Sequence, residues 1–328
     1  MAVVVIEHDS QALRDNPLGD PHVRKLHCIV PDDLAPDARV PVLWWLSGYG
    51  GVGRNVLSDD PWQEGLEQRM ARLRAEGKIG PMIVALPDCF TRYGGSQFIT
   101  SSAHGDYETY LFYELRRAVE SRWHVSGHAI AGKSSGGFGA IVHAMRRPEL
   151  FKAVACHSGD MGFWFAHVPE LPALMRAILE YGGVEALAEA HRHAIKKKTG
   201  KWFASMSMLA YAAAYSPDPS RPLGIALPFD VETGQLDHDV FARWLSWDPV
   251  EMIDRVECQD ALRSLELVFI DCGSRDEYNL QWGARGFARK LTAAGVPHVY
   301  DEFPDGHRST NYRLDVSLPK IYEAVTRA

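Results

Sequence analysis

The sequence predicts an α/β fold with a mostly parallel central sheet, helices on both faces and a helical insertion. Short apolar runs alternate with helical patterns along most of the chain, as expected of a parallel sheet that is covered on both sides. One stretch, residues 160–255, holds helical patterns but no convincing strand. The chain has 328 residues, of which 46% are hydrophobic and 23% charged, so it can bury a large core.

The expected strands are short apolar runs bounded by polar or glycine-containing segments. In chain order they are 25–30, 40–46, 82–86, 128–131, 153–157, 265–271 and 298–303. The helices expected between them span 62–76, 106–121, 138–147, 280–294 and 316–327. Internal repeats and low-complexity segments do not occur in the sequence.

The segment 160–255 interrupts this alternation, with expected helices at 169–181, 184–198, 202–214 and 237–246. We therefore divide the chain into an α/β core, 1–159 and 256–328, and a helical cap or insertion, 160–255. The insertion is rich in aromatic residues, namely Phe163, Trp164, Phe165, Trp202, Phe203, Tyr211, Tyr215, Phe229, Trp244 and Trp247. These side chains form either the core of the insertion or an apolar substrate pocket beneath a cap, and both readings can hold for different residues.

Charge and cysteine usage exclude several classes of protein. The formal net charge is −7 and the pI is about 6.1, without a charged block apart from the short run 196–198, which we read as a solvated helix end. We therefore expect no nucleic-acid partner. The five cysteines are widely spaced and form no C-x-x-C pair, which argues against disulfides and a structural metal site.

The N-terminal run 1–6 is apolar but has no basic leader and no cleavage pattern. No apolar run approaches the roughly 18 residues that a membrane span requires. We therefore expect a cytoplasmic protein without a membrane partner, and the sequence leaves open whether it forms a homo-oligomer.

The run Ala131 to Gly137, Ala-Gly-Lys-Ser-Ser-Gly-Gly, follows an expected strand and precedes an expected helix. A strand, a serine bracketed by glycines and a helix form the context of a nucleophile elbow. The turn is so sharp that side chains two positions before and after the serine would collide, and Gly132 and Gly136 remove them. Ser134 is the candidate nucleophile, because Ser135 would need glycine where Lys133 stands.

The same residues also match the phosphate-binding motif G-x-x-x-x-G-K-S, through Gly127, Gly132, Lys133 and Ser134. The strand 267–271, which ends in an acid, could then serve a magnesium ion. We treat this nucleotide-binding reading as a remote alternative. Residues 119–126 are too polar for the buried strand that should precede such a loop, and two glycines at 136–137 oppose the helix that should follow it.

A serine hydroxyl needs a histidine to take its proton and an acid to orient that histidine. In the hydrolase order both partners follow the serine, in loops after later strands. Asp276 lies just past the strand 265–271, with Asp271 and Glu277 as competing acids, and His307 lies in the glycine-containing loop after 298–303. These residues predict acyl transfer through Ser134, His307 and Asp276.

Two backbone N–H groups should stabilise the oxyanion that forms during the reaction. One is expected from Ser135, the residue after the nucleophile. The other is expected from the loop Leu46 to Gly51, Leu-Ser-Gly-Tyr-Gly-Gly, with the Tyr49 N–H as the candidate. Small residues in this loop let the backbone approach a substrate carbonyl closely.

These residues resemble the putative-esterase family of α/β-hydrolases, which includes esterase D (S-formylglutathione hydrolase), enterochelin esterases and the mycolyltransferase antigens. The similar stretches are 44–48, Pro-Asp at 87–88, 105–110, 132–140 and Asp-Gly-His at 305–307. The resemblance implies an α/β-hydrolase fold, with Ser134 as nucleophile, Asp276 and His307 as partners, and Tyr49 and Ser135 as oxyanion donors.

The chain departs from S-formylglutathione hydrolases in two places. It has Tyr49-Gly50-Gly51 where those enzymes carry a threonine-cysteine pair, and its long helical insertion is not expected of esterase D. We therefore predict a serine carboxylesterase that acts on a small-molecule ester without metal or cofactor. A thioesterase or an acyltransferase with the same triad is the alternative. Phe90, Gln97 and Trp164 are expected to line the substrate pocket.

Overall fold

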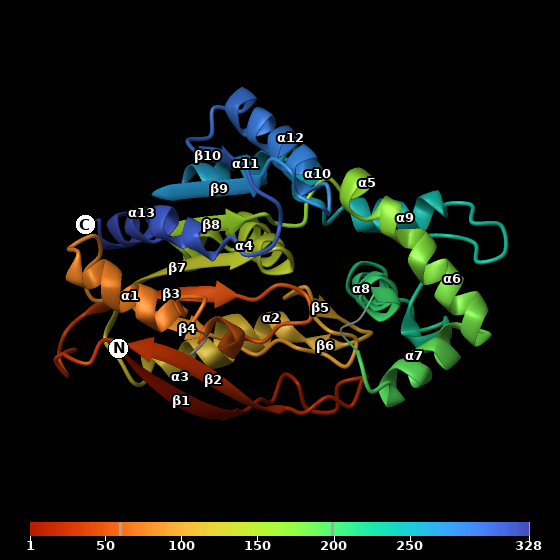
Figure 1. Ribbon diagram of the computed structural model, residues 1–328, viewed down its shortest axis with the longest axis horizontal. Helices are drawn as coiled ribbons and strands as arrows, with labels where there is room; N and C mark the ends of the chain where they lie inside the picture. Colours follow the sequence, from red (N-terminus) through yellow and green to blue (C-terminus); the bar gives the residue numbers. More distant parts are fainter. Residues whose placement is uncertain (59–60, 198–199, 328) are drawn as a thin grey trace.

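An eight-stranded sheet forms the centre of the molecule in a computed structural model that describes residues 1–58, 61–197 and 200–327 (Figure 1). The strand order is β1-β2-β4-β3-β7-β8-β9-β10. The strands are β1 (Ala2–Asp9), β2 (Val23–Val30), β3 (Val40–Leu46), β4 (Ile83–Leu86), β7 (Val125–Lys133), β8 (Ala153–His157), β9 (Leu267–Gly273) and β10 (Val299–Phe303). The pairs from β4 to β10 are parallel, whereas β2 is antiparallel to both of its neighbours, β1 and β4, so the sheet is mostly parallel as the sequence predicts.

Helices cover both faces of this sheet. The helices of the core are α1 (Leu66–Ala75), α2 (Tyr107–Thr109), a π-helical stretch (Tyr110–Leu115), α3 (Arg116–Glu120), α4 (Ser135–Arg146), α11 (Val256–Arg263), α12 (Leu280–Ala293) and α13 (Leu314–Thr326). Buried side chains of α1 and α13 pack on one face, and those of α4 and α12 pack on the other. The central strands β3, β4, β8 and most of β7 and β9 are therefore buried on both sides, which explains why they read as continuous apolar runs.

Three features of the core differ from the sequence prediction. The edge strand β1 was not expected, although the run 1–6 is apolar; at the edge of the sheet most of its residues, such as Val3 and Val5, are exposed. A short hairpin, β5 (Thr100–Ser101) with β6 (Gly105–Asp106), was also missed. The helix after the elbow begins at Ser135 rather than at 138, so glycines 136 and 137 lie inside it.

Between β8 and α11 the chain runs through helices and loops before it returns to the sheet. These helices are α5 (Phe163–Ala166), α6 (Leu171–Tyr181), α7 (Val184–His193), α8 (Gly200–Tyr215), α9 (His238–Leu245) and α10 (Pro249–Met252). The expected helix 184–198 ends at His193, and its last residue lies outside the described residues, as does part of the lysine run 196–198. The group α6–α9 lies at the end of the molecule opposite both chain termini (Figure 1).

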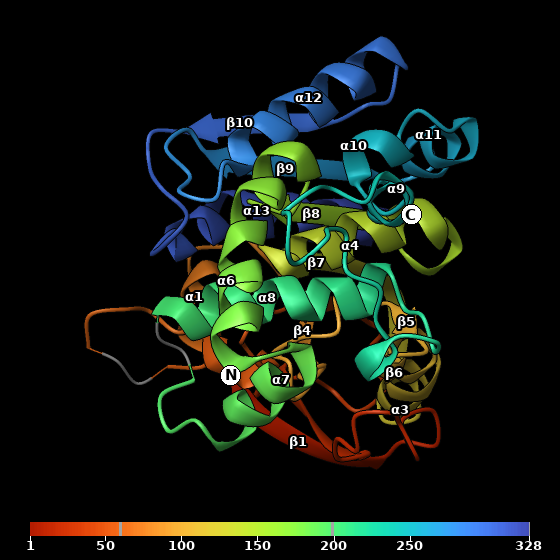
Figure 2. The same ribbon diagram turned by 90° about the vertical axis from the view of Figure 1, so that its right-hand side faces the viewer.

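Helix α8 runs across the front of the strands when the molecule is viewed from that end (Figure 2). Its inner side chains, among them Tyr211 and Tyr215, are buried against the core. The insertion is therefore in contact with the part of the sheet where β3 and β7 end. No helix in the described ranges is long and apolar enough to cross a membrane.

Candidate active site

The turn after β7 holds Ser134 in a conformation that few side chains adopt. Its backbone angles are φ 58° and ψ −127°. A non-glycine residue in such a region costs about 1–3 kcal/mol and persists only where its surroundings fix it. Here the Ser134 N–H donates to the carbonyl of His157 (2.9 Å), while the Ser134 carbonyl accepts from the N–H groups of Phe138 (2.9 Å) and Asp160 (3.3 Å).

The two glycines of the elbow have the steric role that the sequence indicates. A methyl group on Gly132 would stand 2.3 Å from the carbonyl oxygen of Gly136, and one on Gly136 would stand 2.0 Å from that of Leu46. These glycines therefore let α4 and the end of β3 approach each other across the turn. Glycine has a low helix propensity, but its cost inside α4 is smaller than the cost of the steric clash that a side chain would cause. The helix therefore begins at Ser135 and includes both glycines.

The backbone conformation of residues 127–134 is not that of a phosphate-binding loop. Gly127 lies inside β7, and residues 128–131 are buried strand that pairs with both β3 and β8. Their backbone N–H groups belong to the sheet and cannot wrap around a phosphate. The nucleotide-binding alternative is therefore wrong.

His307 and Asp276 meet at the carboxyl end of the sheet. The His307 Nδ1 atom lies 2.7 Å from Asp276 Oδ2, and both residues are buried. The other carboxylate oxygen, Oδ1, accepts from the Tyr278 N–H at 2.9 Å, and the Tyr278 ring stands edge-on to the imidazole, with centroids 4.9 Å apart. The imidazole is therefore held on two sides.

The two competing acids are engaged elsewhere. Asp271 Oδ1 lies 2.7 Å from Nδ1 of His157, and its Oδ2 accepts from Arg313. Glu277 accepts the backbone N–H of His307 at 2.7 Å, so it fixes the loop rather than the ring. Of the three acids, Asp276 alone is bonded to the His307 imidazole.

Ser134 and His307 face one cavity of about 420 Å³. No hydrogen bond joins Ser134 Oγ to His307 in the described residues; such bonds are often long before substrate binds. The cavity wall is built from four parts of the chain. These are the first loop and elbow (Gly48, Tyr49, Lys133), the segment after β8 (Asp160, Ala166, His167, Glu170), α8 (Phe203, Ala204, Ser207, Met208, Tyr211) and the segments near Asp276 and His307 (Tyr278, Leu280, Arg308, Ser309). Aromatic and apolar side chains therefore share this wall with about as many polar and charged ones, so the cavity offers both apolar contact and hydrogen-bonding groups to a small molecule.

Of the two residues expected to supply oxyanion donors, Tyr49 lines this cavity, and Ser135 follows Ser134 and lines the small neighbouring pocket that Gly48 and Tyr49 also border. Ser135 is the first residue of α4, so its N–H has no partner within the helix. Tyr49 lines the cavity wall, and Gly48 beside it approaches so closely that a methyl group there would stand 3.3 Å from Ser134 Cβ. The structure thus brings Ser134, His307, Asp276, Tyr49 and Ser135 together.

The expected pocket residues are distributed differently. Gln97 is buried behind the elbow, where its Nε2 donates to Asp160 (3.3 Å) and Tyr215 (2.8 Å). Trp164 is 47% exposed and packs on Phe241, because one step along α5 turns it outward while Phe163 points inward. The structure does not bring Trp164 to the cavity.

Phe90 does not line the cavity either. Its carbonyl accepts from Arg24 at 2.9 Å, on the side of β2. Its position after the strand β4 suggested a pocket residue, but the chain turns away from the elbow before the loop 91–97 returns to it.

Sequence reasoning missed most of the polar residues that line the cavity, and two of them adjoin the elbow. Lys133, read as a variable elbow position, lines the cavity, and burial lowers the pKa of its ammonium. Asp160 is 4% exposed, and burial raises the pKa of its carboxyl. A signal was present for Asp160, since polar residues just after the carboxyl end of a strand next to the elbow strand often belong to the site.

Comparison with known proteins decides the family. The family model described as "Putative esterase" matches residues 21–321. The chain belongs to this esterase family. Two curated relatives from Mycobacterium tuberculosis strains, Esterase MT1326 and Esterase Rv1288, are each 24% identical over 301 residues, which cover 89% of this chain. The chain spans about half the length of these relatives, 54% in each case.

Solved structures of esterases share the fold. A ferulic acid esterase superposes with a TM-score of 0.62 at 21% identity, covering 99% of this chain and 98% of its own. An S-formylglutathione hydrolase from Agrobacterium tumefaciens gives 0.60 at 16% identity, covering 98% and 95%. FphF, a fluorophosphonate-binding serine hydrolase of Staphylococcus aureus, gives 0.55 at 16% identity, covering 99% of each chain. This family member therefore has the α/β-hydrolase fold.

Proposed function

We propose that the chain is a serine carboxylesterase that works through Ser134, His307 and Asp276 and an acyl-enzyme intermediate. The observation that carries the proposal is the buried pair of His307 and Asp276, which opens onto the same cavity as the strained Ser134. The membership of the esterase family supports it.

The proposed mechanism begins with the tautomer of His307. An ionised carboxylate only accepts hydrogen bonds, so the contact with Asp276 keeps the proton on Nδ1 and leaves Nε2 as the base. Nε2 takes the Ser134 proton as the hydroxyl attacks the ester carbonyl. The Tyr49 and Ser135 N–H groups stabilise the oxyanion, and the protonated imidazole then gives its proton to the leaving alcohol.

The second half of the cycle repeats these roles with water. His307 takes a proton from water as the water oxygen attacks the acyl-enzyme carbonyl, and collapse of the intermediate returns the proton to Ser134 and releases the acid. We further propose that residues 160–255 act as a cap, since Phe203, Met208 and Tyr211 of α8 line the cavity. The aromatic wall and the volume of about 420 Å³ favour a short or an aryl acyl group.

The test is hydrolysis of p-nitrophenyl acetate and butyrate by the wild-type chain and by Ser134→Ala. Catalysis by the wild type and loss in the variant, with an unchanged melting temperature, is the expected result. A fluorophosphonate probe should label the wild type only. Full activity of Ser134→Ala, or labelling of that variant at the wild-type rate, would overturn the proposal.

A substrate panel separates the remaining alternatives for this triad. The names of the structural neighbours suggest methyl ferulate and S-formylglutathione as two arms beside the p-nitrophenyl esters. A larger kcat/KM for the thioester would favour the thioesterase alternative. Transester formation in the presence of glycerol would favour acyl transfer, which requires exclusion of water from the acyl-enzyme.

A further inference from the structure

We infer that Tyr211 of α8, together with Asp160, is a positioning residue for the oxyanion hole, acting through Ser135 and Tyr49. This inference rests on the proposed function and adds a role for the insertion. Three sets of contacts support it: those of Asp160 with the elbow, those of the Tyr211 hydroxyl with Ser135, and those of the α8 aromatic rings with Tyr49.

Asp160 contacts both residues of the elbow. Its backbone N–H donates to the Ser134 carbonyl at 3.3 Å, and its Oδ2 accepts from the Ser135 hydroxyl at 2.9 Å. The strained backbone of Ser134 needs surroundings that fix it, and Asp160 supplies contacts on both sides of the Ser134–Ser135 peptide. That peptide carries the N–H group proposed as an oxyanion donor.

The Tyr211 hydroxyl completes this buried cluster from the side of the insertion. It lies 3.1 Å from the Ser135 hydroxyl oxygen. Either hydroxyl can donate in this contact, and a side-chain hydrogen bond also links Tyr211 to Asp160, so the three side chains form one hydrogen-bonded cluster. Ser135 is 1% exposed and Tyr211 is 6% exposed, so water is poorly placed to replace the phenol.

The rings of α8 also contact the other proposed donor residue. The Tyr49 ring meets Phe203 edge-on at 5.2 Å between centroids and Tyr211 at 5.9 Å. The far end of Tyr49 is anchored, since its hydroxyl donates to the Tyr93 carbonyl at 2.6 Å. Tyr211 therefore touches both residues whose N–H groups form the proposed oxyanion hole.

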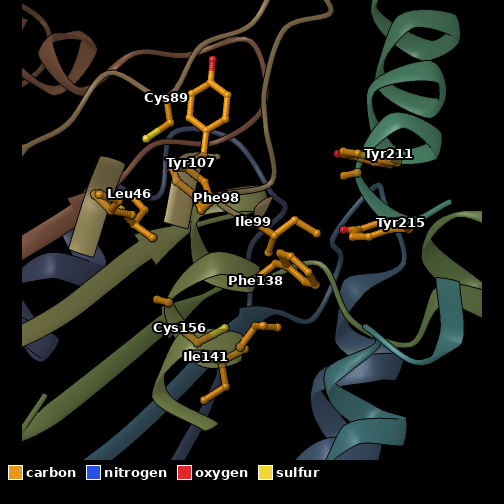
Figure 3. Close-up of a cluster of buried hydrophobic side chains, with 14 of the residues drawn as sticks. Leu46, Cys89, Phe98, Ile99, Tyr107, Phe138, Ile141, Cys156, Tyr211 and Tyr215 are labelled. Atoms are coloured by element: carbon orange, nitrogen blue, oxygen red, sulfur yellow. The ribbon is translucent and has the colours of Figure 1, made fainter. Parts of the chain in front are cut away.

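The position of Tyr211 on α8 fits this role. Tyr211 and Tyr215 project from the same side of the helix towards the buried cluster that contains Phe138 and Ile99 (Figure 3). The hydroxyl of Tyr215 is bonded to Gln97 and makes no direct bond to Ser135. The two tyrosines thus form a matched pair, because both are buried on one helix but only one contacts the elbow.

Removal of the Tyr211 hydroxyl takes away the hydrogen-bond partner that Ser135 has on the insertion, and water is poorly placed to replace it. The elbow peptide is then free to shift. Misplacement of a catalytic group by about 1 Å can cost roughly 10²-fold in rate. We expect Tyr211→Phe to lower kcat by about that factor while KM changes little, since the oxyanion forms only in the transition state.

The experiment is a double-mutant cycle on kcat with Tyr211→Phe, Ser135→Ala and the double variant, and with Tyr215→Phe as the control. Ser135→Ala keeps the backbone N–H. If Tyr211 acts through the Ser135 hydroxyl, the double variant should be no slower than the slower single variant. Tyr215→Phe should retain kcat within a few-fold. Melting temperatures show which variants are folded, and Ser135→Ala carries the test if Tyr211→Phe does not fold.

A second readout distinguishes positioning from a merely structural role. A boronic acid inhibitor forms a tetrahedral adduct with the serine, so its affinity should fall in parallel with kcat, whereas the affinity for the product acid should not. Wild-type kcat in Tyr211→Phe, or losses that multiply independently in the double variant, would overturn the inference. Activity retained by Ser134→Ala would instead overturn the proposed function itself.

Discussion

Two buried aspartate–histidine pairs with the same contact distance lie at the end of the sheet, and they should respond differently to the same substitution. Asp276 lies 2.7 Å from His307, whereas Asp271 lies 2.7 Å from His157. Only His307 opens onto the cavity that contains Ser134. Replacement of each aspartate by asparagine therefore separates a catalytic from a structural pair.

In Asp276→Asn the amide can donate to Nδ1, so the imidazole proton moves to Nε2 and the base towards Ser134 is lost. In the serine-protease triad this replacement costs about 10⁴-fold in kcat, which corresponds to about 5 kcal/mol of activation free energy. Stability should change less, because the amide still fills the site.

In Asp271→Asn the main loss is of stability. The carboxylate is 1% exposed and also accepts from the partly buried Arg313, so its neutralisation removes one of the two carboxylate partners of that guanidinium and leaves only Asp301. Breaking a buried ion pair costs about 3–5 kcal/mol of folding stability. Because the asparagine amide fills the same space and can still form hydrogen bonds, we expect a loss at the lower end of this range. The activity per folded molecule should remain close to that of the wild type.

The assay is kcat for p-nitrophenyl butyrate, normalised to the fraction of folded protein, combined with urea unfolding of both variants. The expected pattern is a kinetic loss without large destabilisation in Asp276→Asn and the reverse in Asp271→Asn. A wild-type kcat in Asp276→Asn, or a loss of about 10⁴-fold in Asp271→Asn, would refute the assignment of the triad acid.

Packing, burial and thiol chemistry give three more measurable outcomes. Gly136→Ala should lower the free energy of unfolding by about 1–3 kcal/mol, because the added methyl group would stand 2.0 Å from the Leu46 carbonyl oxygen. Urea unfolding measures the loss. Gly200→Ala is the control, since a methyl group there meets nothing within 4 Å. Burial lowers the pKa of His143 to about 4, so the unfolded chain binds its proton first and stability falls as the pH drops from about 6.5 to 4. In His143→Gln the free energy of unfolding should fall less steeply with decreasing pH, by about 1.4 kcal/mol per pH unit. Equal slopes for the wild type and the variant would contradict this. Burial raises the pKa of the Cys28 thiol to about 12, so iodoacetamide at pH 8 should leave it unmodified until denaturant is added, and rapid labelling of the native protein would disprove it.

The local pattern of the chain determined most of the fold and pointed to the residues of the candidate site. Apolar runs predicted seven of the strands, and glycines around Ser134 predicted a strand–turn–helix elbow because only a sharp turn needs glycine at both positions. The positions of Asp276 and His307 after successive strands predicted that they would meet, since the carboxyl ends of parallel strands lie at one edge of a sheet.

The walls of the cavity were decided only by the tertiary structure. Trp164 and Tyr211 read alike in the sequence, as aromatic residues of the insertion, yet one is turned to solvent and the other lies against the elbow. Which face of a helix meets the core depends on contacts between segments far apart in the chain, here α8 and the turn after β7. The partner of each acid was settled in the same way, because Asp271 and Asp276 differ in the histidine that folding brings within 2.7 Å, not in any local pattern.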